Sequence, residues 1–264
     1  MRQTTLIIIA ILCFGTINAA KQPSPDAIIS KADSAYNAKK YSEAADLYAS
    51  VLRDFGASSD VYYNLGNAYF RMGKTAQSIL SYERALKVDP SNNDARANLE
   101  YIKTTLEDKP EDNATILGKL HNSVIAMMSP NAWTWTTFIL FLVLLGLIGL
   151  YLFMSDIKIR KIGFFGSIVL LFVFVYIVVV AYQSATAIDN DKIAIVTVPS
   201  ANLTSTPSAT IDKNDKIVPV HEGTRLEIID SINSANNTGA QLWYHVKVNN
   251  STAAWIDASN VEKV

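Results

Sequence analysis

The sequence has 264 residues, of which 50% are hydrophobic, and its formal net charge is −1 at pH 7. This balanced charge excludes the excess of Lys and Arg that marks a nucleic-acid-binding surface, so we expect no nucleic-acid partner. The only cysteine, Cys13, lies in an apolar N-terminal run. A chain processed beyond that run would have no disulfide, thiolate metal site or cysteine nucleophile.

The N-terminal residues have the layout of a secretory signal peptide. Arg2 precedes an apolar run, Leu6–Phe14, which is too short to span a bilayer comfortably, and small residues follow it. We predict a signal peptide over residues 1–20, with cleavage after Ala19 or Ala20. An uncleaved membrane anchor is the alternative.

Residues 25–92 contain an internal repeat with a period of 34 residues. Small and aromatic side chains recur at this spacing: Ala32 with Gly66, Ala35 with Tyr69, Ala44 with Ser78, Tyr48 with Tyr82, and Val51 with Ala85. Small residues let two helices approach closely, and the tyrosines fill the space between them. The period and the residue types resemble the tetratricopeptide repeat (TPR), a pair of helices. We predict a TPR domain over residues 25–106, with two repeats and a capping helix over Asn93–Leu106.

The TPR resemblance implies protein binding, because the first helices of successive repeats line a concave surface. Carried over to this chain, the groove positions are Ile29, Asp33, Tyr36, Tyr63, Asn67, Phe70, Arg71, Asn98 and Tyr101. The sequence departs from the carboxylate clamp of some family members, because Tyr63 stands where that clamp has Lys. The alternative is that Tyr63, Phe70 and Tyr101 pack against neighbouring helices or a later segment of the chain.

Residues 107–131 are predicted to be a charged linker and an amphipathic helix. After the Pro-containing linker, apolar residues recur at helical spacing: Ile116, Leu117, Leu120, Val124, Met127 and Met128. This pattern predicts an interfacial helix lying on the outer leaflet of a membrane. A helix packed under the TPR domain would have the same pattern.

Two apolar runs dominate the middle of the chain. Trp135–Met154 has 20 residues without a charge, and Ile162–Tyr182 has 21. A helix rises about 1.5 Å per residue, so each run can cross a hydrocarbon core of roughly 30 Å. We predict transmembrane helices over residues 134–154 and 162–183, joined as a hairpin. A buried core hairpin of a soluble protein is the alternative.

The turn between the spans indicates the orientation. Residues 155–161 contain three basic side chains and one acidic side chain: Lys158, Arg160, Lys161 and Asp156. Basic residues near span ends are retained in the cytoplasm, so we predict a cytoplasmic turn with both flanking domains outside. Trp133, Trp135 and Tyr182 then lie at the outer interface. For a bacterial inner membrane, this places the TPR and C-terminal domains in the periplasm.

Residues 193–264 change to short β-branched segments separated by turns. The pattern predicts five strands: Ile193–Val198, Lys216–Val220, Thr224–Asp230, Leu242–Val248 and Ala253–Ile256. Segments Ala201–Leu203, His221–Ile228, Trp243–Val248 and Ala254–Ile256 resemble bacterial SH3-like domains, which implies a small all-β barrel. Thr204 and Ala254 stand where that family usually has Arg and Gly.

Some SH3-like domains bind cell-wall peptides, so the resemblance implies a peptidoglycan site that includes Trp243 and Trp255. Packing of both rings in the core or at the mouth of the barrel is the alternative. The three histidines, His121, His221 and His245, lie in unlike contexts, and no nucleophile elbow or phosphate loop occurs. We therefore expect no enzymatic activity, no cofactor and no metal site.

The predicted protein is a multidomain membrane protein with all-α TPR repeats, a two-helix transmembrane hairpin and a C-terminal all-β SH3-like barrel. This order, with Ser129–Trp133 before the first span, resembles the BatE-like TPR proteins of the Bacteroides aerotolerance (Bat) operon. The resemblance implies an inner-membrane scaffold in oxidative or envelope stress. Its implied partners are von Willebrand A-domain Bat proteins and a MoxR-type ATPase. An envelope sensor or anchor that binds peptidoglycan is the alternative.

Overall fold

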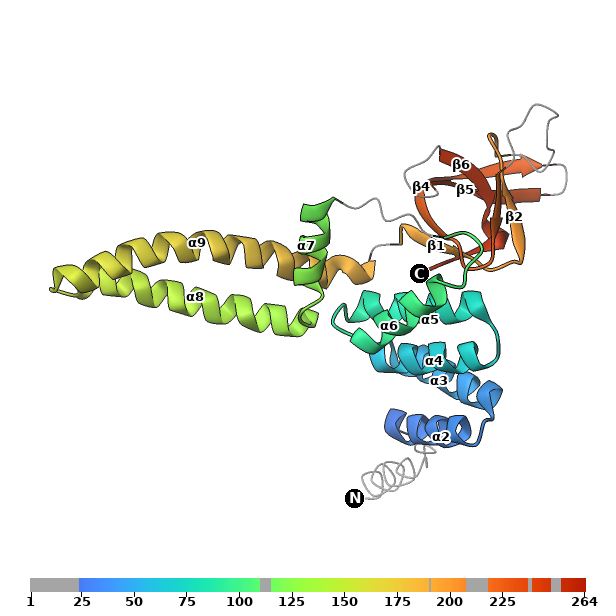
Figure 1. Cartoon of the computed structure of the whole chain (residues 1–264), viewed down its shortest axis with the longest axis horizontal. Helices are drawn as coiled ribbons and strands as arrows, with labels where there is room; N and C mark the ends of the chain where they lie inside the picture. The colour runs from blue at the N-terminus through green and yellow to red at the C-terminus, as the bar shows by residue number, and fades with distance from the viewer. Residues whose placement is uncertain (1–23, 110–114, 190, 208–217, 237–238, 248–252) are drawn as a thin grey trace, which may run out of the picture.

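The computed structural model describes residues 24–109, 115–189, 191–207, 218–236, 239–247 and 253–264. The predicted signal peptide lies outside the described residues. Figure 1 shows a long helical hairpin at one end of the molecule. A stack of short helices and a small β domain lie together at the other end.

The helical stack has five helices, each packed on the next along the chain. They are α2 (Pro25–Asn37), α3 (Tyr41–Phe55), α4 (Ser59–Arg71), α5 (Thr75–Val88) and α6 (Asn93–Lys103). The turns inside the two helix pairs are equivalent, because Lys39 and Gly73 both have a positive φ and are 34 residues apart. The predicted helical repeat is therefore present over both copies.

Close helix contact explains the small residues of the repeat. A Cβ atom added to Gly66 would lie only 2.6 Å from Cε1 of Tyr82, so α4 and α5 could not approach as closely with a larger residue. Ala32 and Ala44, the first-repeat residues at equivalent positions to Gly66 and Ser78, are fully buried. The predicted cap is also present, since Leu99 of α6 is buried in the second-repeat core.

Two long apolar helices form the hairpin, α8 (Pro130–Phe153) and α9 (Ile157–Thr186). Both are long and apolar enough to cross a membrane, and only 6% of the most apolar stretch of each is buried. The core helices of a soluble protein are mostly buried within their own chain, whereas these two are mostly exposed. Helix α9 begins before the predicted span, because the Asp156 carboxylate accepts hydrogen bonds from the Lys158 and Ile159 backbone N–H groups. The basic residues thus lie on its first turns.

Helix α7 (Ile116–Ile125) packs across α9 at the end of the hairpin nearest the helical stack (Figure 1). The His121 ring lies 3.2 Å from the Tyr176 hydroxyl and 2.5 Å from the Gln183 side-chain oxygen. The Trp133 indole N–H donates to the carbonyl of Ile125 at 3.1 Å. These contacts fix α7 on the hairpin.

The C-terminal domain contains seven strands within its described residues, in two sheets. They are β1 (Ile193–Val196), β2 (Ser200–Leu203), β3 (Val218–His221), β4 (Arg225–Asn236), β5 (Gly239–Lys247), β6 (Ala253–Asp257) and β7 (Val261–Lys263). The larger sheet has the order β6-β5-β4-β1-β7, and β2 pairs with β3. All pairs are antiparallel.

The predicted closed barrel differs from this arrangement, because the described part of the larger sheet does not close. Strands β2, with four residues, and β7, with three, were not predicted. A bridge between Thr204 and Trp255 joins β2 to β6, and a core that includes Val196, Leu226 and Ile256 lies inside the domain.

The β domain packs directly on the TPR helices, and the two share one apolar core. Ile195 of β1 and Val264 are buried with Ile79 of α5 and Ile102 of α6. Gly223 has φ +87°, and a Cβ atom there would lie 2.8 Å from Ile79 Cδ1. The turn after β3 therefore needs glycine both for its backbone and for its closeness to α5.

Asp108 connects the two domains through polar contacts. Its Oδ2 accepts hydrogen bonds from the His221 backbone N–H at 2.7 Å and the Thr224 hydroxyl at 2.6 Å. Its Oδ1 lies 3.0 Å from His221 Nδ1, and Glu107 lies 3.3 Å from His221 Nε2. On α5, the Ala76 N–H donates to the Glu222 carboxylate at 3.0 Å. We call Asp108, His221 and Thr224 the interdomain latch.

Both ionisable groups of the latch have shifted pKa values. The hydrogen bond to Asp108 raises the pKa of His221 above its ordinary value, and the charges of Asp108 and Glu107 raise it further. Burial alone would raise the pKa of Asp108. The hydrogen bonds from Thr224 and His221 outweigh burial and hold that pKa below its ordinary value.

We expect the domain contact to weaken as pH rises through the raised pKa of His221. A raised pKa means stabilisation that is complete below the ordinary histidine value of 6.5 and lost at higher pH. The lowered Asp108 pKa means stabilisation present above 3.8 and lost as pH falls below it. Hydrogen exchange of the Ile195 amide in the full chain from pH 5 to pH 9 measures the loss. The variant His221→Gln should flatten this dependence, and an unchanged profile would show that the latch is not its source.

Candidate protein-binding groove

The first helices α2, α4 and α6 present the predicted groove, and the second helices support it through a repeated contact. The Tyr48 hydroxyl of α3 donates to Asp33 of α2 at 2.5 Å. The Tyr82 hydroxyl of α5 donates to Asn67 of α4 at 2.6 Å. Both residues of the second contact lie 34 positions after those of the first. The repeat therefore places one acceptor from α2 and one from α4 on the floor of the predicted groove.

These tyrosines remain protonated donors at neutral pH. Burial is the main cause that raises the pKa of Tyr82 to about 12. Burial, with the hydrogen bond to Asp33, raises the pKa of Tyr48 even further. Asn98 of α6 adds a second donor to Asn67, with its Nδ2 atom 2.9 Å from Asn67 Oδ1. The floor is thus a fixed polar network.

Two adjoining hollows lie over this network. One has a volume of about 230 Å³ and is lined by Tyr36, Asn67, Phe70, Arg71, Tyr82, Asn98, Tyr101 and Ile102. The other has a volume of about 250 Å³ and is lined by Asp33, Tyr36, Asn37, Tyr48, Asn64 and Asn67. Because Tyr36 and Asn67 line both, the two hollows adjoin on one face of the stack, which we call the groove. It brings together seven of the nine predicted positions.

The rim of the groove has exposed aromatic rings. Phe70 is 43% exposed and Tyr101 is 62% exposed. Their ring centroids lie 6.2 Å apart in an edge-to-face arrangement. The Arg71 guanidinium donates a hydrogen bond to the Tyr36 hydroxyl oxygen, which raises the pKa of the guanidinium. Aromatic rings, amides and one cation can bind a peptide through apolar side chains and backbone hydrogen bonds.

Two predicted positions do not line these hollows. Ile29 is partly buried against the core of the first repeat. Tyr63 packs on the second-repeat core, with its ring centroid 6.1 Å from that of Tyr82. For Tyr63, packing against neighbouring helices is therefore what the structure shows. Asn64 was missed, although it lies one 34-residue period before the predicted Asn98.

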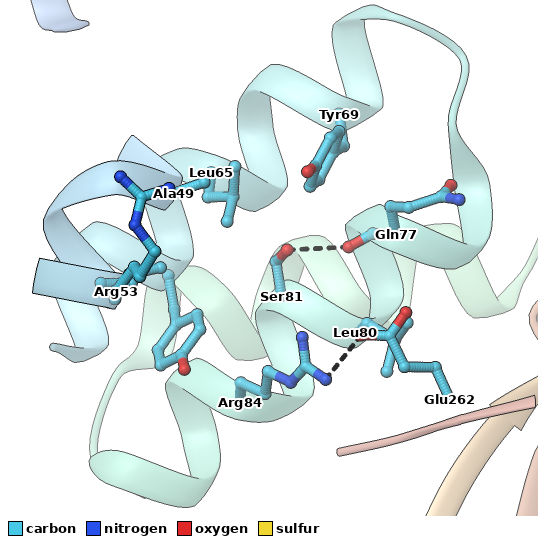
Figure 2. A pocket seen from close by; sticks show the side chains of 11 residues that line it. Ala49, Arg53, Leu65, Tyr69, Gln77, Leu80, Ser81, Arg84 and Glu262 are labelled. Carbon is cyan, nitrogen blue, oxygen red and sulfur yellow. Dashed lines mark hydrogen bonds and ion pairs between the residues drawn. The ribbon is translucent and has the colours of Figure 1, made fainter. Parts of the chain in front are cut away.

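A further hollow of about 330 Å³ lies where α3, α4 and α5 meet strand β7. Figure 2 shows Arg84 reaching toward Glu262, and the ion pair between them measures 2.8 Å. The Ser81 hydroxyl donates to the Gln77 carbonyl beside it at 2.8 Å. The sequence analysis predicted neither this hollow nor strand β7, which contributes Glu262 to its lining.

The two candidate tryptophans of the C-terminal domain have different environments. Trp243 is 5% exposed and is therefore an interior residue. Trp255 is partly buried and stacks on His245, with centroids 4.6 Å apart and an interplanar angle of 18°. The structure does not bring the two rings together as a stacked pair.

The stacked helix pairs and their open groove define a helical-repeat domain of the kind that binds other proteins. Residues 59–92, which contain α4 and α5, match the family model of the tetratricopeptide repeat. These residues are a tetratricopeptide repeat, and α2 with α3 repeats its geometry. Comparison with curated proteins gives no match.

Proposed function

We propose that this protein is a non-enzymatic membrane scaffold whose TPR groove captures a segment of a partner protein. The observation that carries the proposal is the groove of two adjoining hollows, with Phe70 and Tyr101 exposed at its rim. All the residues that line it come from α2 to α6. The β domain packs on another face of the stack, so it supports the repeats and leaves the groove open.

The groove favours an extended peptide with an apolar or aromatic side chain. Asn67 and Asn98 lie along the floor, where amides can donate to and accept from a peptide backbone. The exposed rings offer apolar contact area with little loss of side-chain entropy on binding. Arg71 adds one positive charge, which favours an acidic residue at one end of the peptide.

The hairpin would hold both soluble domains at the membrane. Its basic residues favour a cytoplasmic turn, which places the TPR and β domains together on the outer side, the periplasm in a bacterial inner membrane. The exposure of Ile116, Leu117 and Leu120 on α7 supports contact of that helix with the outer leaflet. The direct packing of the two domains agrees with a shared side.

The order of parts supports a further step in this proposal. A signal peptide, TPR domain, hairpin and SH3-like domain would make the chain a BatE-like scaffold in a Bat complex. Its partners would then be von Willebrand A-domain membrane proteins and, across the membrane, a MoxR-type ATPase. The stress response that this resemblance implies belongs to the same proposal.

Photocrosslinking in cells tests partner capture. A photoreactive residue at Phe70 or Tyr101 is expected to crosslink another membrane protein, identified by mass spectrometry. The control position is Phe55, which is 44% exposed but lies outside the groove. The variant Phe70→Ala with Tyr101→Ala should reduce capture at least tenfold, since buried aromatic anchors commonly contribute about 2 kcal/mol or more. Crosslinks confined to this chain, or equal capture from Phe55, would contradict the proposal.

A further inference from the structure

A small hollow lies at the end of the hairpin farthest from the soluble domains. Its volume is about 290 Å³. It is lined by Tyr151, Ile157, Arg160, Lys161, Phe164 and Phe165. One wall comes from the end of α8, and the rest comes from the first turns of α9. The groove-based proposal gives this hollow no role.

Aromatic rings form the apolar part of the hollow. The ring centroids of Tyr151 and Phe164 lie 5.4 Å apart, and those of Phe164 and Phe165 lie 5.2 Å apart. Phe164 is 41% exposed and Phe165 is 62% exposed. The rings therefore present a joined apolar surface that the described chain leaves open.

Two cations complete the lining. The Arg160 guanidinium carbon lies 5.6 Å from the centroid of the Tyr151 ring, which holds the guanidinium over the aromatic wall. Lys161 follows it along the helix. The nearby acid, Asp156, accepts hydrogen bonds from backbone N–H groups of α9. Among the residues that the structure describes, no salt bridge pairs Arg160 or Lys161 with a carboxylate.

We propose that this hollow binds the phosphate group of an anionic phospholipid. Arg160 and Lys161 would contact the phosphate, and the rings of Phe164 and Phe165 would contact the glycerol and upper acyl chains. The hollow lies where the basic start of α9 meets its apolar run, which is the level of the headgroups if the hairpin crosses a membrane. The inference rests on the membrane placement in the proposed function and is independent of the TPR groove.

A free phosphate ion would also bind Arg160 and Lys161, but it has no apolar part that could contact the aromatic rings. The open aromatic surface beside the charges therefore favours a lipid as the source of the phosphate. Lys158 provides a matched control, because it carries the same charge on the same helical turn but does not line the hollow.

The test uses the full chain in nanodiscs of phosphatidylcholine that contain a minor fraction of phosphatidylglycerol. Native mass spectrometry counts the phosphatidylglycerol that stays bound. The variants Arg160→Gln and Lys161→Gln should each reduce its retention about fivefold, since one basic residue at a membrane surface contributes on the order of 1 kcal/mol. Lys158→Gln should change retention less than twofold. Phe165→Ala should also reduce retention, although it removes no charge.

Four results would overturn the inference. An equal loss in Lys158→Gln would mean general attraction of anionic lipid to the basic turn. Displacement of the bound lipid by inorganic phosphate, with no effect of Phe165→Ala, would identify an ion site. Wild-type retention equal to that of phosphatidylcholine would mean no site. A chain that does not insert into nanodiscs would refute the membrane placement and this site together, whereas crosslinking from Phe70 tests the groove separately.

Discussion

Replacing Gly163 with Ala is expected to force α8 and α9 apart and to destabilise the hairpin by about 1–3 kcal/mol. A Cβ atom at Gly163 would lie 2.7 Å from the Leu147 carbonyl oxygen and 2.7 Å from the Tyr151 backbone nitrogen. Both neighbours belong to the backbone of α8, so no side chain can rotate away to make room. Small residues at helix contacts have this role in membranes, where close packing replaces the hydrophobic effect.

Gly166 and Gly149 provide matched controls for this substitution. A Cβ atom at Gly166 would lie 3.4 Å from a Leu147 methyl group, an ordinary contact, and one at Gly149 would meet nothing within 4 Å. Alanine at either position should therefore be neutral, or stabilising by up to about 1 kcal/mol through its helix propensity. Unfolding by sodium dodecyl sulfate in mixed micelles compares the three variants. Equal stability of all three would mean that α8 and α9 do not pack at Gly163.

Replacing Gly223 with Val is expected to destabilise the contact between the TPR and β domains by about 2–5 kcal/mol. Two costs combine in this estimate. A positive φ costs a β-branched residue about 1–2 kcal/mol, and overpacking of a core costs about 1–3 kcal/mol. The new side chain would press on Ile79 and Leu106, since its Cβ atom alone would lie 2.8 Å from a methyl carbon of each.

Gly73→Val separates these two costs. Gly73 has φ +72°, but a Cβ atom there would meet nothing within 4 Å. This variant carries the backbone cost alone, so the difference in urea midpoint between the two variants reports packing at the domain contact. We also expect the Ile195 amide to exchange hydrogen faster in Gly223→Val but not in Gly73→Val. Equal effects of the two variants would mean that the domains do not pack at Gly223.

Local patterns in the sequence were enough to predict the helices. A 34-residue period and small residues such as Ala32 and Gly66 identify a repeat, because helix pairing depends on side chains close together in sequence. The two long apolar helices follow in the same way from charge-free runs. The basic turn was placed less well, because Asp156 caps α9 and extends it over residues predicted to lie outside it.

Contacts between distant segments could not be predicted in this way. Asp108 lies in a charged linker, and His221 lies at the end of a strand. The two residues are 113 positions apart, and no local sequence pattern indicates that they are hydrogen-bond partners. Strand β7 has only three residues, too few for alternation to be recognised. Strand β7 is defined by its pairing with β1, and that pairing exists only in the folded domain.

The groove shows both situations. Tyr36, Phe70 and Tyr101 were predicted from repeat positions, and the structure places all three at the same hollow. Tyr63 was predicted from the same repeat pattern, but its ring packs on Tyr82 of the next helix. Which face a tyrosine occupies depends on the space left by its neighbours, and a repeat pattern does not contain that information.

The shared core of the TPR and β domains also sets an order of events during synthesis. Arg84 and its partner Glu262 are 178 residues apart. At the usual rate of translation, roughly 10–35 s pass between the emergence of α5 and that of β7. The hairpin lies between them and, if it crosses a membrane, is inserted in the meantime. Until the β domain is complete, Ile79 and Ile102 lack the cover that Ile195 and Val264 provide together. The nascent TPR domain therefore exposes an apolar surface that chaperones can bind before its C-terminal strands arrive.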